Sequence, residues 1–252
     1  MIRVCSGFSQ SGYSEYGKRF LDTFHKHWPQ SVDLMVFTEA DVEMPRGSCR
    51  SLWECRGAAQ FIARHRENPE RCGTKQHAKW KPKYIGRPYN FRFDAVKFCR
   101  QCFIPEAAAE GMEDGDILVW LDADVVTFAD VPQLMVSKLL GSDDITFLGR
   151  QGTHSEIGFW AVRLNHRTRE FLAMFADTWR SDKVFDLDEW HSAFVFDWCR
   201  RHTSMIQHNM TPLGRGHVFA ESLLHNWLDH LKGDRRKLLG KSPEMDNIRT
   251  KG

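Results

Sequence analysis

The segment at residues 116–128, DILVWLDADVVTF, constrains the fold of this chain more than any other stretch. Six mostly apolar residues lead directly to two carboxylates, Asp122 and Asp124, which are separated by one alanine. A nearly continuous apolar run is typical of a strand that is covered on both faces, as in a parallel sheet. In open α/β sheets, ligands bind beyond the carboxyl ends of the strands. The segment therefore predicts a buried strand with a polar site at its end.

The rest of the chain predicts an α/β fold around this strand. Residues 1–6 and 32–39 are short and apolar, as strands are, and the aromatic residues from Tyr13 to Phe24 recur at helical spacing between them. Strand, helix and strand in this order predict a right-handed βαβ unit in a parallel sheet. Further helices are expected at 51–66, 91–104, 129–140, 167–181 and 188–202, and further strands at 144–150 and 157–164.

Residues 40–90 interrupt this regular alternation. After the expected helix at 51–66, residues 67–90 contain three prolines, two glycines and six lysine or arginine residues. This composition predicts an extended loop. We expect an insertion at about 40–90, whose charges form either a solvated face or a lid that closes over phosphates. The whole chain, 1–252, is expected to be one domain with a basic tail at 232–252.

Composition excludes several other classes of protein. The 252 residues and the hydrophobic fraction of 42% suit one large domain, or one domain with an insertion. A formal net charge of +2 does not indicate nucleic acid as a partner. No apolar stretch approaches the roughly 18 residues that a membrane span needs. The first residues do not resemble a signal peptide, so we expect a cytoplasmic protein.

The seven cysteines are expected to be mostly free thiols, because disulfides are rare in the cytosol. Cys99 and Cys102 form a C-x-x-C pair, and Cys49, Cys55 and Cys72 lie upstream. A zinc site is one interpretation of this set. The irregular spacing and the helical pattern around the pair favour small buried residues instead.

Asp122 and Asp124 are the candidate metal ligands. One intervening residue lets both carboxylates point to the same side if the chain stays extended. Two like charges at this spacing repel and would raise the pKa of one of them, a conflict that a divalent cation removes. The alternative is a pair of surface aspartates in a turn. The apolar run before the pair, with Val125 and Val126 after it, favours a metal that binds phosphate.

These features together resemble a known family. An N-terminal βαβ unit, a mid-chain apolar strand ending in D-x-D and a late basic segment are similar to the nucleotide-sugar glycosyltransferases of the GT-A fold, in particular small bacterial and viral members. The resemblance covers about 1–40 and 90–236. It implies a Rossmann-like α/β fold with a mixed, mostly parallel sheet flanked by helices. It also implies Mn²⁺ or Mg²⁺ as cofactor, a UDP- or GDP-sugar as donor, and an acceptor that the sequence does not identify.

The resemblance assigns the donor site to the D-x-D pair and the tail. Asp124 would chelate the metal most directly, and Asp122 would reach the metal or the ribose. The segment HLKGDRRK resembles a C-terminal H-x-K-G motif, in which His230 would be the third metal ligand and Lys232 would contact the diphosphate. His217 and His225 are competing histidines.

Two further segments are assigned through the same resemblance. HSEIGFWAVRL resembles an E-x-G-F segment, so Glu156 and Gly158 would border the acceptor sugar. DLDEWHSAF resembles an acidic helix start beneath the reacting sugar carbon, with Asp188, Glu189 and His191 as catalytic candidates. Glu189 would serve as a base for inversion or lie behind the sugar for retention, and the similarity to D-Q-x-x-L favours retention. Asp188 is also expected to be a helix N-cap.

Basic residues before the D-x-D strand complete the expected donor site. In related enzymes this helix contacts the donor, which would assign Arg92 and Lys97 to the nucleotide sugar. The alternative is exposed helical charge, with Lys97 paired to Asp94 or Glu106.

The nucleoside is expected to lie near the ends of the first two strands. Thr38 and Glu39, at the end of the second strand, are placed for a ribose or base contact. Tyr13 and Tyr16 would either stack on the base or pack in the core, and their helical spacing favours the core.

Three rival interpretations remain. A haloacid dehalogenase-type phosphatase also uses D-x-D, with the first aspartate as nucleophile, but there the motif opens the chain and leads into a Gly-Thr turn. A nucleotidyltransferase would need a third strand carboxylate and an upstream Gly-Ser pair, which we do not find. A non-catalytic nucleotide-sugar-binding protein would retain the fold without the chemistry.

Overall fold

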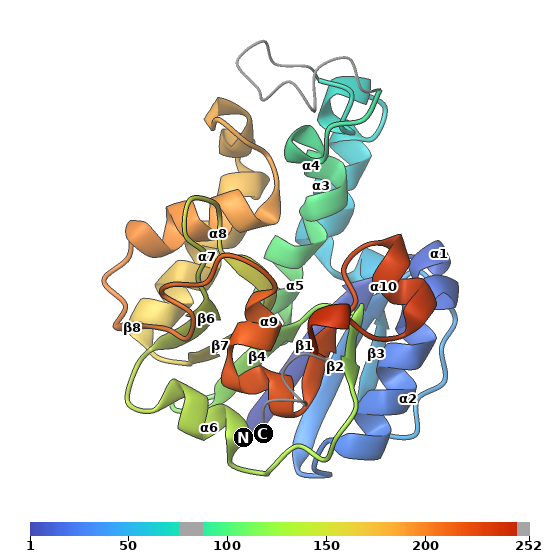
Figure 1. The fold of residues 1–252 in the computed structure, drawn as a ribbon. Helices are drawn as coiled ribbons and strands as arrows, with labels where there is room; N and C mark the ends of the chain where they lie inside the picture. Colours follow the sequence, from blue (N-terminus) through green and yellow to red (C-terminus); the bar gives the residue numbers. More distant parts are fainter. Residues whose placement is uncertain (76–87, 246–252) are drawn as a thin grey trace.

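The computed structural model describes residues 1–75 and 88–245, and within this part a seven-stranded sheet forms the centre, in the order β3-β2-β1-β4-β7-β6-β8 (Figure 1). The strands β3-β2-β1-β4 are parallel, as is the β6-β8 pair, whereas β7 runs antiparallel between β4 and β6. The predicted class, a mixed and mostly parallel sheet flanked by helices, is confirmed. The strands are β1 (Ile2–Phe8), β2 (Val32–Thr38), β3 (Ser48–Ser51), β4 (Ile117–Leu121), β6 (Ile145–Leu148), β7 (Glu156–Arg163) and β8 (Gln207–Asn209).

The expected βαβ unit opens the chain. β1 and β2 pair in parallel, with Ile2 opposite Val32. The connection is helical and has three parts: α1 (Gln10–Gly12), the π-helical turn η1 (Tyr13–Gly17) and α2 (Lys18–His27). A π turn inside a helix often marks a functional site.

Both faces of β4 are covered, as its apolar sequence predicts. Ile117, Val119 and Leu121 pack into one hydrophobic cluster, with residues of α2, α6 and α9. Leu118 and Trp120 point to the opposite face, where they pack with residues of α3, α5, α7 and α8. These helices and the remaining ones are α3 (Arg56–His65), α4 (Ala95–Phe98), α5 (Arg100–Ala108), α6 (Met135–Leu140), α7 (His166–Arg180), α8 (Ser192–Arg201), α9 (Val218–Glu221) and α10 (Asp234–Leu239).

The expected insertion at about 40–90 is partly wrong. β3 pairs in parallel with β2, so this part of the segment belongs to the sheet. Its sequence, SCRS, carries no apolar signal for a strand. The helix expected at 51–66 consists of the 3₁₀ turn η2 (Leu52–Glu54) and α3, which stands with α4 at the top of Figure 1.

The lid predicted within 67–90 falls largely on residues 76–87, which lie outside the described residues, as do residues 246–252 of the expected basic tail. The described flank packs on the segment before α8. Lys75 Nζ lies 3.9 Å from the Trp190 ring centre, and Arg71 lies 4.1 Å from that of Phe185. The lid stays a prediction.

Three expected helices have different boundaries. The helix at 91–104 is divided into η5 (Phe91–Phe93), α4 and α5, because Asp94 caps a new helix by accepting the backbone N–H of Lys97. The helix at 129–140 begins only at Met135, because Pro132 disfavours a helical Val131.

The helix expected at 188–202 begins at Ser192. Trp190 N–H donates to the carbonyl of Arg92 at 2.6 Å, which ties the preceding residues to η5. His191 occupies the N-cap position, so the expected cap at Asp188 is wrong, and Asp188 is exposed.

All seven cysteines are free thiols. Cys99 and Cys102 are fully buried in the hydrophobic core, and burial raises the pKa of both. Their surroundings agree with the interpretation of small buried residues. Among residues 1–75 and 88–245, no helix is both long and apolar enough to cross a membrane.

Asp144, next to β6, holds the start of α7 and the residue before β8, and its removal is expected to destabilise the fold. Its buried carboxylate accepts from Asn165 Nδ2 at 2.6 Å, Arg167 Nε at 2.7 Å and Ile206 N at 2.7 Å. Asp144→Ala leaves these donors without their acceptor, so we expect a loss of about 2 kcal/mol in the free energy of unfolding at pH 7, measured by urea denaturation. The control Asp143→Ala should change it by less than about 0.5 kcal/mol.

The same substitution has an expected pH dependence. Burial alone would raise the pKa of Asp144, but hydrogen bonds from Arg167, Ile206 and Asn165 lower it below its ordinary value. The stabilisation by Asp144 is therefore fully present above the pKa that this carboxyl has in the unfolded chain. It is lost as the pH falls through the lower pKa that the carboxyl has in the folded protein. The difference between wild type and Asp144→Ala should shrink below about pH 4. A difference that stays constant down to pH 2 would contradict this account.

Candidate functional site

The D-x-D pair lies in a tight turn at the carboxyl end of β4. Val125 N–H donates to the carbonyl of Asp122 at 3.0 Å, so the chain does not stay extended as expected. After the turn, β5 (Val125–Thr127) pairs antiparallel with β9 (Leu228–His230), and Val125 lies opposite His230. This two-stranded ribbon, rather than an extended D-x-D, brings the C-terminal histidine to the two aspartates.

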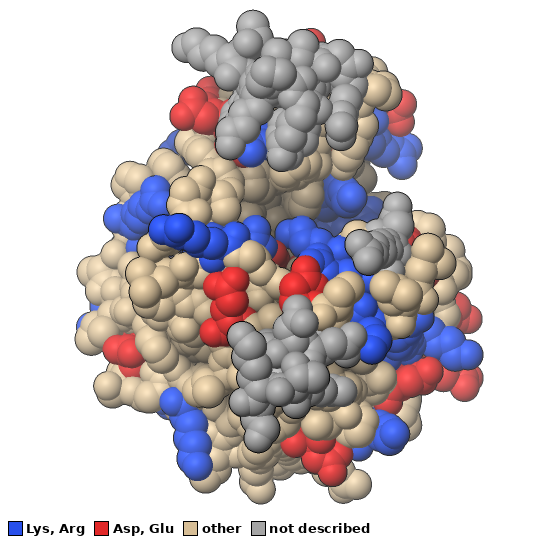
Figure 2. Space-filling model, in the orientation of Figure 1, with Lys and Arg blue, Asp and Glu red and all other residues tan. Residues whose placement is uncertain are grey.

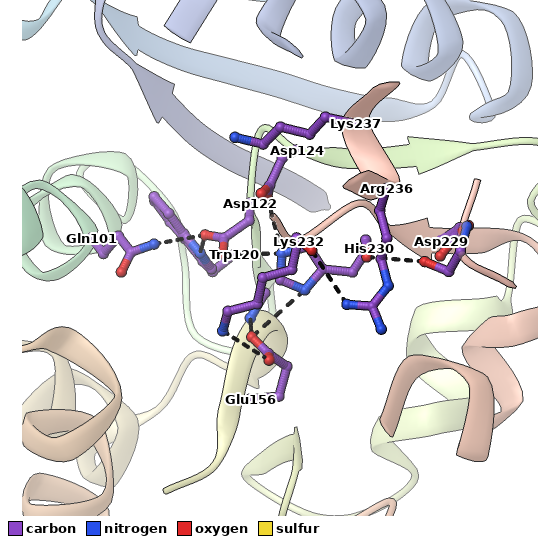
Figure 3. Close-up of polar contacts among 12 residues, drawn as sticks. Gln101, Trp120, Asp122, Asp124, Glu156, Asp229, His230, Lys232, Arg236 and Lys237 are labelled. Carbon is purple, nitrogen blue, oxygen red and sulfur yellow. Dashed lines mark hydrogen bonds and ion pairs between the residues drawn. The ribbon is translucent and has the colours of Figure 1, made fainter. Parts of the chain in front are cut away.

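Asp122, Asp124 and His230 converge on one point (Figure 3). His230 Nε2 lies 2.9 Å from Asp124 Oδ1 and 3.8 Å from Asp122 Oδ2. One ligand atom from each residue lies within 4.8 Å of the other two. The structure therefore brings together the three residues that the sequence suggested as metal ligands.

The electrostatics of this cluster favour a cation. Enclosure and the neighbouring Asp124 charge raise the pKa of Asp122 to about 6. Enclosure alone would also raise the pKa of Asp124, but the His230 imidazole lowers it to about 2. Two carboxylates that repel each other beside an imidazole are a donor set that a divalent cation fits, since it removes the repulsion.

Two residues that sequence reasoning missed hold Asp122, and a third holds one of them. Trp120 Nε1 and Gln101 Nε2 both donate to Asp122 Oδ1 at 2.8 Å, and the Ser192 hydroxyl donates to the Gln101 side-chain oxygen. Oδ1 is thereby occupied, and Oδ2 is left toward His230. Gln101 lies 21 residues before Asp122 and belongs to no motif, and Trp120 reads as one more apolar residue of the strand.

Replacing Gln101 by leucine is expected to weaken Mn²⁺ binding. The change removes one of the two donors that fix Asp122, and loss of such a partner typically lowers metal affinity about 10- to 100-fold. Isothermal titration calorimetry with Mn²⁺ measures the effect, and Gln60→Leu, exposed on α3, is the control. Equal affinity in both variants would show that Gln101 does not position Asp122.

Gly158 packs directly against the His230 ring, which leaves no room for a side chain at this position. A Cβ atom on Gly158 would lie 2.7 Å from both Cε1 and Nδ1 of His230. The Gly158 carbonyl also accepts the backbone N–H of Asp122 at 2.9 Å. The residue expected to border the acceptor thus shapes the candidate metal site.

A cavity of about 450 Å³ opens onto the three clustered residues. Glu156, which also lines it, accepts from Lys232 Nζ at 3.2 Å and forms an ion pair with Arg150. On the face shown in Figure 2, lysine and arginine side chains form a band across the middle. The basic residues that line the cavity are Arg92, Lys97, Arg150, Lys232 and Lys237.

Lys97 does not form the alternative ion pair with Asp94 or Glu106. Its ammonium lies 5.9 Å from the Tyr89 ring centre and 5.8 Å from that of Phe98. The Asp94 carboxylate accepts the Tyr89 hydroxyl instead, and Glu106 pairs with Arg180. Lys97 is exposed and lines the cavity.

Glu189, the main catalytic candidate, is enclosed behind the cavity wall. Its carboxylate pairs with Arg92 at 2.5 Å, and it accepts hydrogen bonds from His154 Nε2 at 3.2 Å and His191 Nε2 at 2.8 Å. Only 5% of the Glu189 side chain is exposed. Burial alone would raise the pKa of Glu189, but the two histidines lower it to about 2. Arg92, His154 and His191 line the cavity, whereas Glu189 and Asp188 do not.

Of the four residues expected near the nucleoside, only Tyr16 lines the cavity. Thr38 is buried and accepts the backbone N–H of Ala40, and Glu39 pairs with Arg100. Neither of the two lines the cavity. Both tyrosines lie in the π turn: Tyr13 stacks on Phe8, whereas Tyr16 lines the cavity, as Asp124 does.

The competing histidines lie in other contacts. His217 Nε2 is hydrogen-bonded to the Ser242 hydroxyl and lies 3.5 Å from Asp229 Oδ1. His225 Nδ1 is hydrogen-bonded to the carbonyl of Ser222. Neither contacts the D-x-D pair in these interactions.

The solved structures that match this chain include two glycosyltransferases. No family model matches the sequence, and no curated protein matches it. A glycosyltransferase involved in the glycosylation of the major capsid of PBCV-1 is similar over 94% of this chain and 98% of its own, with a TM-score of 0.48 and 13% identity. The glycosyltransferase GlyE of Streptococcus pneumoniae TIGR4 is similar over 82% of this chain and 45% of its own, with a TM-score of 0.41 and 13% identity. At these scores neither likeness determines an activity, which has to rest on the site itself.

Proposed function

We propose that this chain is a metal-dependent glycosyltransferase of the GT-A type, which transfers a sugar from a UDP- or GDP-sugar to an acceptor. The observation that carries the proposal is the convergence of Asp122, Asp124 and His230 within 4.8 Å of one another at the end of β4. They lie at a cavity with a basic lining, as binding of a diphosphate requires.

The three residues would hold Mn²⁺ or Mg²⁺, and the ion would stabilise the negative charge that develops on the departing diphosphate. Gln101 and Trp120 keep Asp122 oriented for this role. Lys232, with 60% of its side chain exposed, is proposed to contact the diphosphate. Glu156, which also pairs with Arg150, holds its ammonium group beside the cluster by charge.

The donors around Asp122 support its proposed role as a metal ligand. Asp122, the first aspartate of the motif, has Oδ1 engaged by two donors, and its Oδ2 lies 3.8 Å from His230 Nε2. The phosphatase alternative would instead use this residue as the nucleophile, which the hydrolysis test distinguishes. Proposed contacts of Arg92 and Lys97 with the donor, and of Tyr16 with its base, agree with their places in the cavity lining.

The retaining outcome that the sequence favoured depended on Glu189 behind the sugar. In the structure this carboxylate is shielded by Arg92, His154 and His191. The stereochemistry therefore depends on which side chain of the cavity wall meets the acceptor. The cytoplasmic location stays a prediction.

The test is hydrolysis of a panel of UDP- and GDP-hexoses, with and without Mn²⁺. A glycosyltransferase should release nucleoside diphosphate from at least one donor only when the metal is present. A binding protein should show a thermal shift without turnover, since a ligand at 100 times its Kd adds about 2.7 kcal/mol to stability. Release of phosphate from p-nitrophenyl phosphate without any nucleotide sugar would favour the phosphatase.

A further inference from the structure

Glu189 orients two histidines in the cavity wall. A carboxylate oxygen can only accept, so the nitrogen of each histidine that faces Glu189, Nε2 in both cases, carries the proton. In a neutral imidazole the other nitrogen, Nδ1, is then a proton acceptor. Glu189 thus fixes the tautomer of His154 and of His191.

His154 is the more accessible of the two. It has 26% of its side chain exposed, against 6% for His191, and both line the cavity. Its ring lies edge-on to His191 and Phe194, each at 5.2 Å between ring centres. Among the residues that the structure describes, His154 forms its hydrogen bond through Nε2.

A permanent positive charge shares the Glu189 oxygen that His154 faces. Arg92 lies 2.5 Å from the same Glu189 oxygen that faces His154, so Glu189 is already balanced by a permanent positive charge. His191 faces the other oxygen, and burial lowers its pKa, which favours its neutral form. A metal ion in this cluster would have to displace the Arg92 guanidinium, which favours proton transfer over metal binding.

We propose that His154 is the general base that activates the acceptor, an inference that rests on the proposed glycosyl transfer. Nδ1 takes the proton of the acceptor hydroxyl while its oxygen forms a bond to the anomeric carbon. The bond from that carbon to the diphosphate oxygen breaks, and the nucleoside diphosphate leaves with the electron pair. Glu189 stabilises the imidazolium that results. One displacement inverts the anomeric centre, so the product is the inverted glycoside.

The test uses water as acceptor, with the UDP- or GDP-hexose that the wild type hydrolyses. At saturating Mn²⁺, wild-type hydrolysis should fall on acidification, as the proposed base becomes protonated. His154→Gln should lower the rate about 10²- to 10⁴-fold and abolish this acid limb. The sugar released by wild type should first have the inverted configuration in a rapid NMR measurement. His202→Gln, at the exposed end of α8, is the control.

Binding of Mn²⁺ with UDP or GDP, measured by calorimetry, separates the base from a structural residue. His154→Gln should bind both as the wild type does, and imidazole should restore part of the activity of His154→Gly. Retained anomeric configuration, or an acid limb that persists in His154→Gln, would overturn the base assignment and leave the glycosyltransferase intact. A wild type that neither binds nucleotide with Mn²⁺ nor hydrolyses any donor would overturn both proposals.

Discussion

Asp124→Asn is expected to lower Mn²⁺-dependent turnover of the nucleotide sugar about a thousandfold, equivalent to about 4 kcal/mol of lost charge stabilisation. Asp124 is the carboxylate nearest to His230, at 2.9 Å, and asparagine keeps its shape while removing its charge. In the variant, Asp122 and His230 remain as ligands, and the site has one negative charge fewer with which to hold a divalent cation. The measurements are turnover of the active donor and Mn²⁺ affinity by calorimetry.

The same variant should not lose stability in the absence of metal. The charge of Asp124 raises the pKa of Asp122, so removing that charge relieves a repulsion in the folded protein. It also removes the favourable contact with His230 that lowers the pKa of Asp124. Because the two effects oppose each other, we expect the metal-free melting temperature to change little. Asp130→Asn is the control, because Asp130 has 90% of its side chain exposed and lies outside the cavity lining. Unchanged turnover and unchanged Mn²⁺ affinity in Asp124→Asn would refute the metal site.

Gly158→Ala is expected to damage the metal site by a different route. The added Cβ would lie 2.7 Å from two atoms of the His230 ring and 3.2 Å from the Phe219 ring. Gly158 cannot retreat, because β7 is paired with both β4 and β6. The imidazole has to move, so we expect a loss of about 1–3 kcal/mol in the free energy of unfolding. Mn²⁺ affinity should fall at least about 10- to 100-fold.

A double-mutant cycle tests whether His230 is the cause. In a His230→Ala background the ring is absent, so Gly158→Ala should cost much less stability than it does in the wild type. Urea denaturation of the four proteins gives this interaction energy. If Gly158→Ala is equally destabilising in both backgrounds, the clash with His230 is not what excludes a side chain at this position.

The centre of the fold could be predicted because its signals are local. β4 is buried on both faces, so its sequence is apolar without interruption and the charged pair after it stands out. β1 and β2 are apolar too, and the helical spacing between them is regular. β3, by contrast, is four polar or exposed residues at the sheet edge, and β5 and β9 are three residues each, too short to show a period. These strands form because they pair with segments far away in the sequence or at the edge of the sheet, and such pairing leaves no local sequence pattern.

The candidate site could be predicted only in part, for the same reason. Asp122 and Asp124 are neighbours in sequence, and a basic segment after His230 marked it among 12 histidines. His154 lies 35 residues from Glu189, and the two are brought together by the packing of the loop before β7 against the start of α8. The sequence pointed to Glu189 but could not show that Arg92, His154 and His191 enclose it. Burial by distant residues leaves no local pattern.

The most direct test of the central claim is an anomalous difference map from crystals grown with Mn²⁺ and UDP or GDP. The proposed function predicts one strong manganese peak between Asp122, Asp124 and His230, in contact with the diphosphate oxygens. Manganese bound elsewhere, or nucleotide bound in the cavity without metal at these three residues, would contradict it.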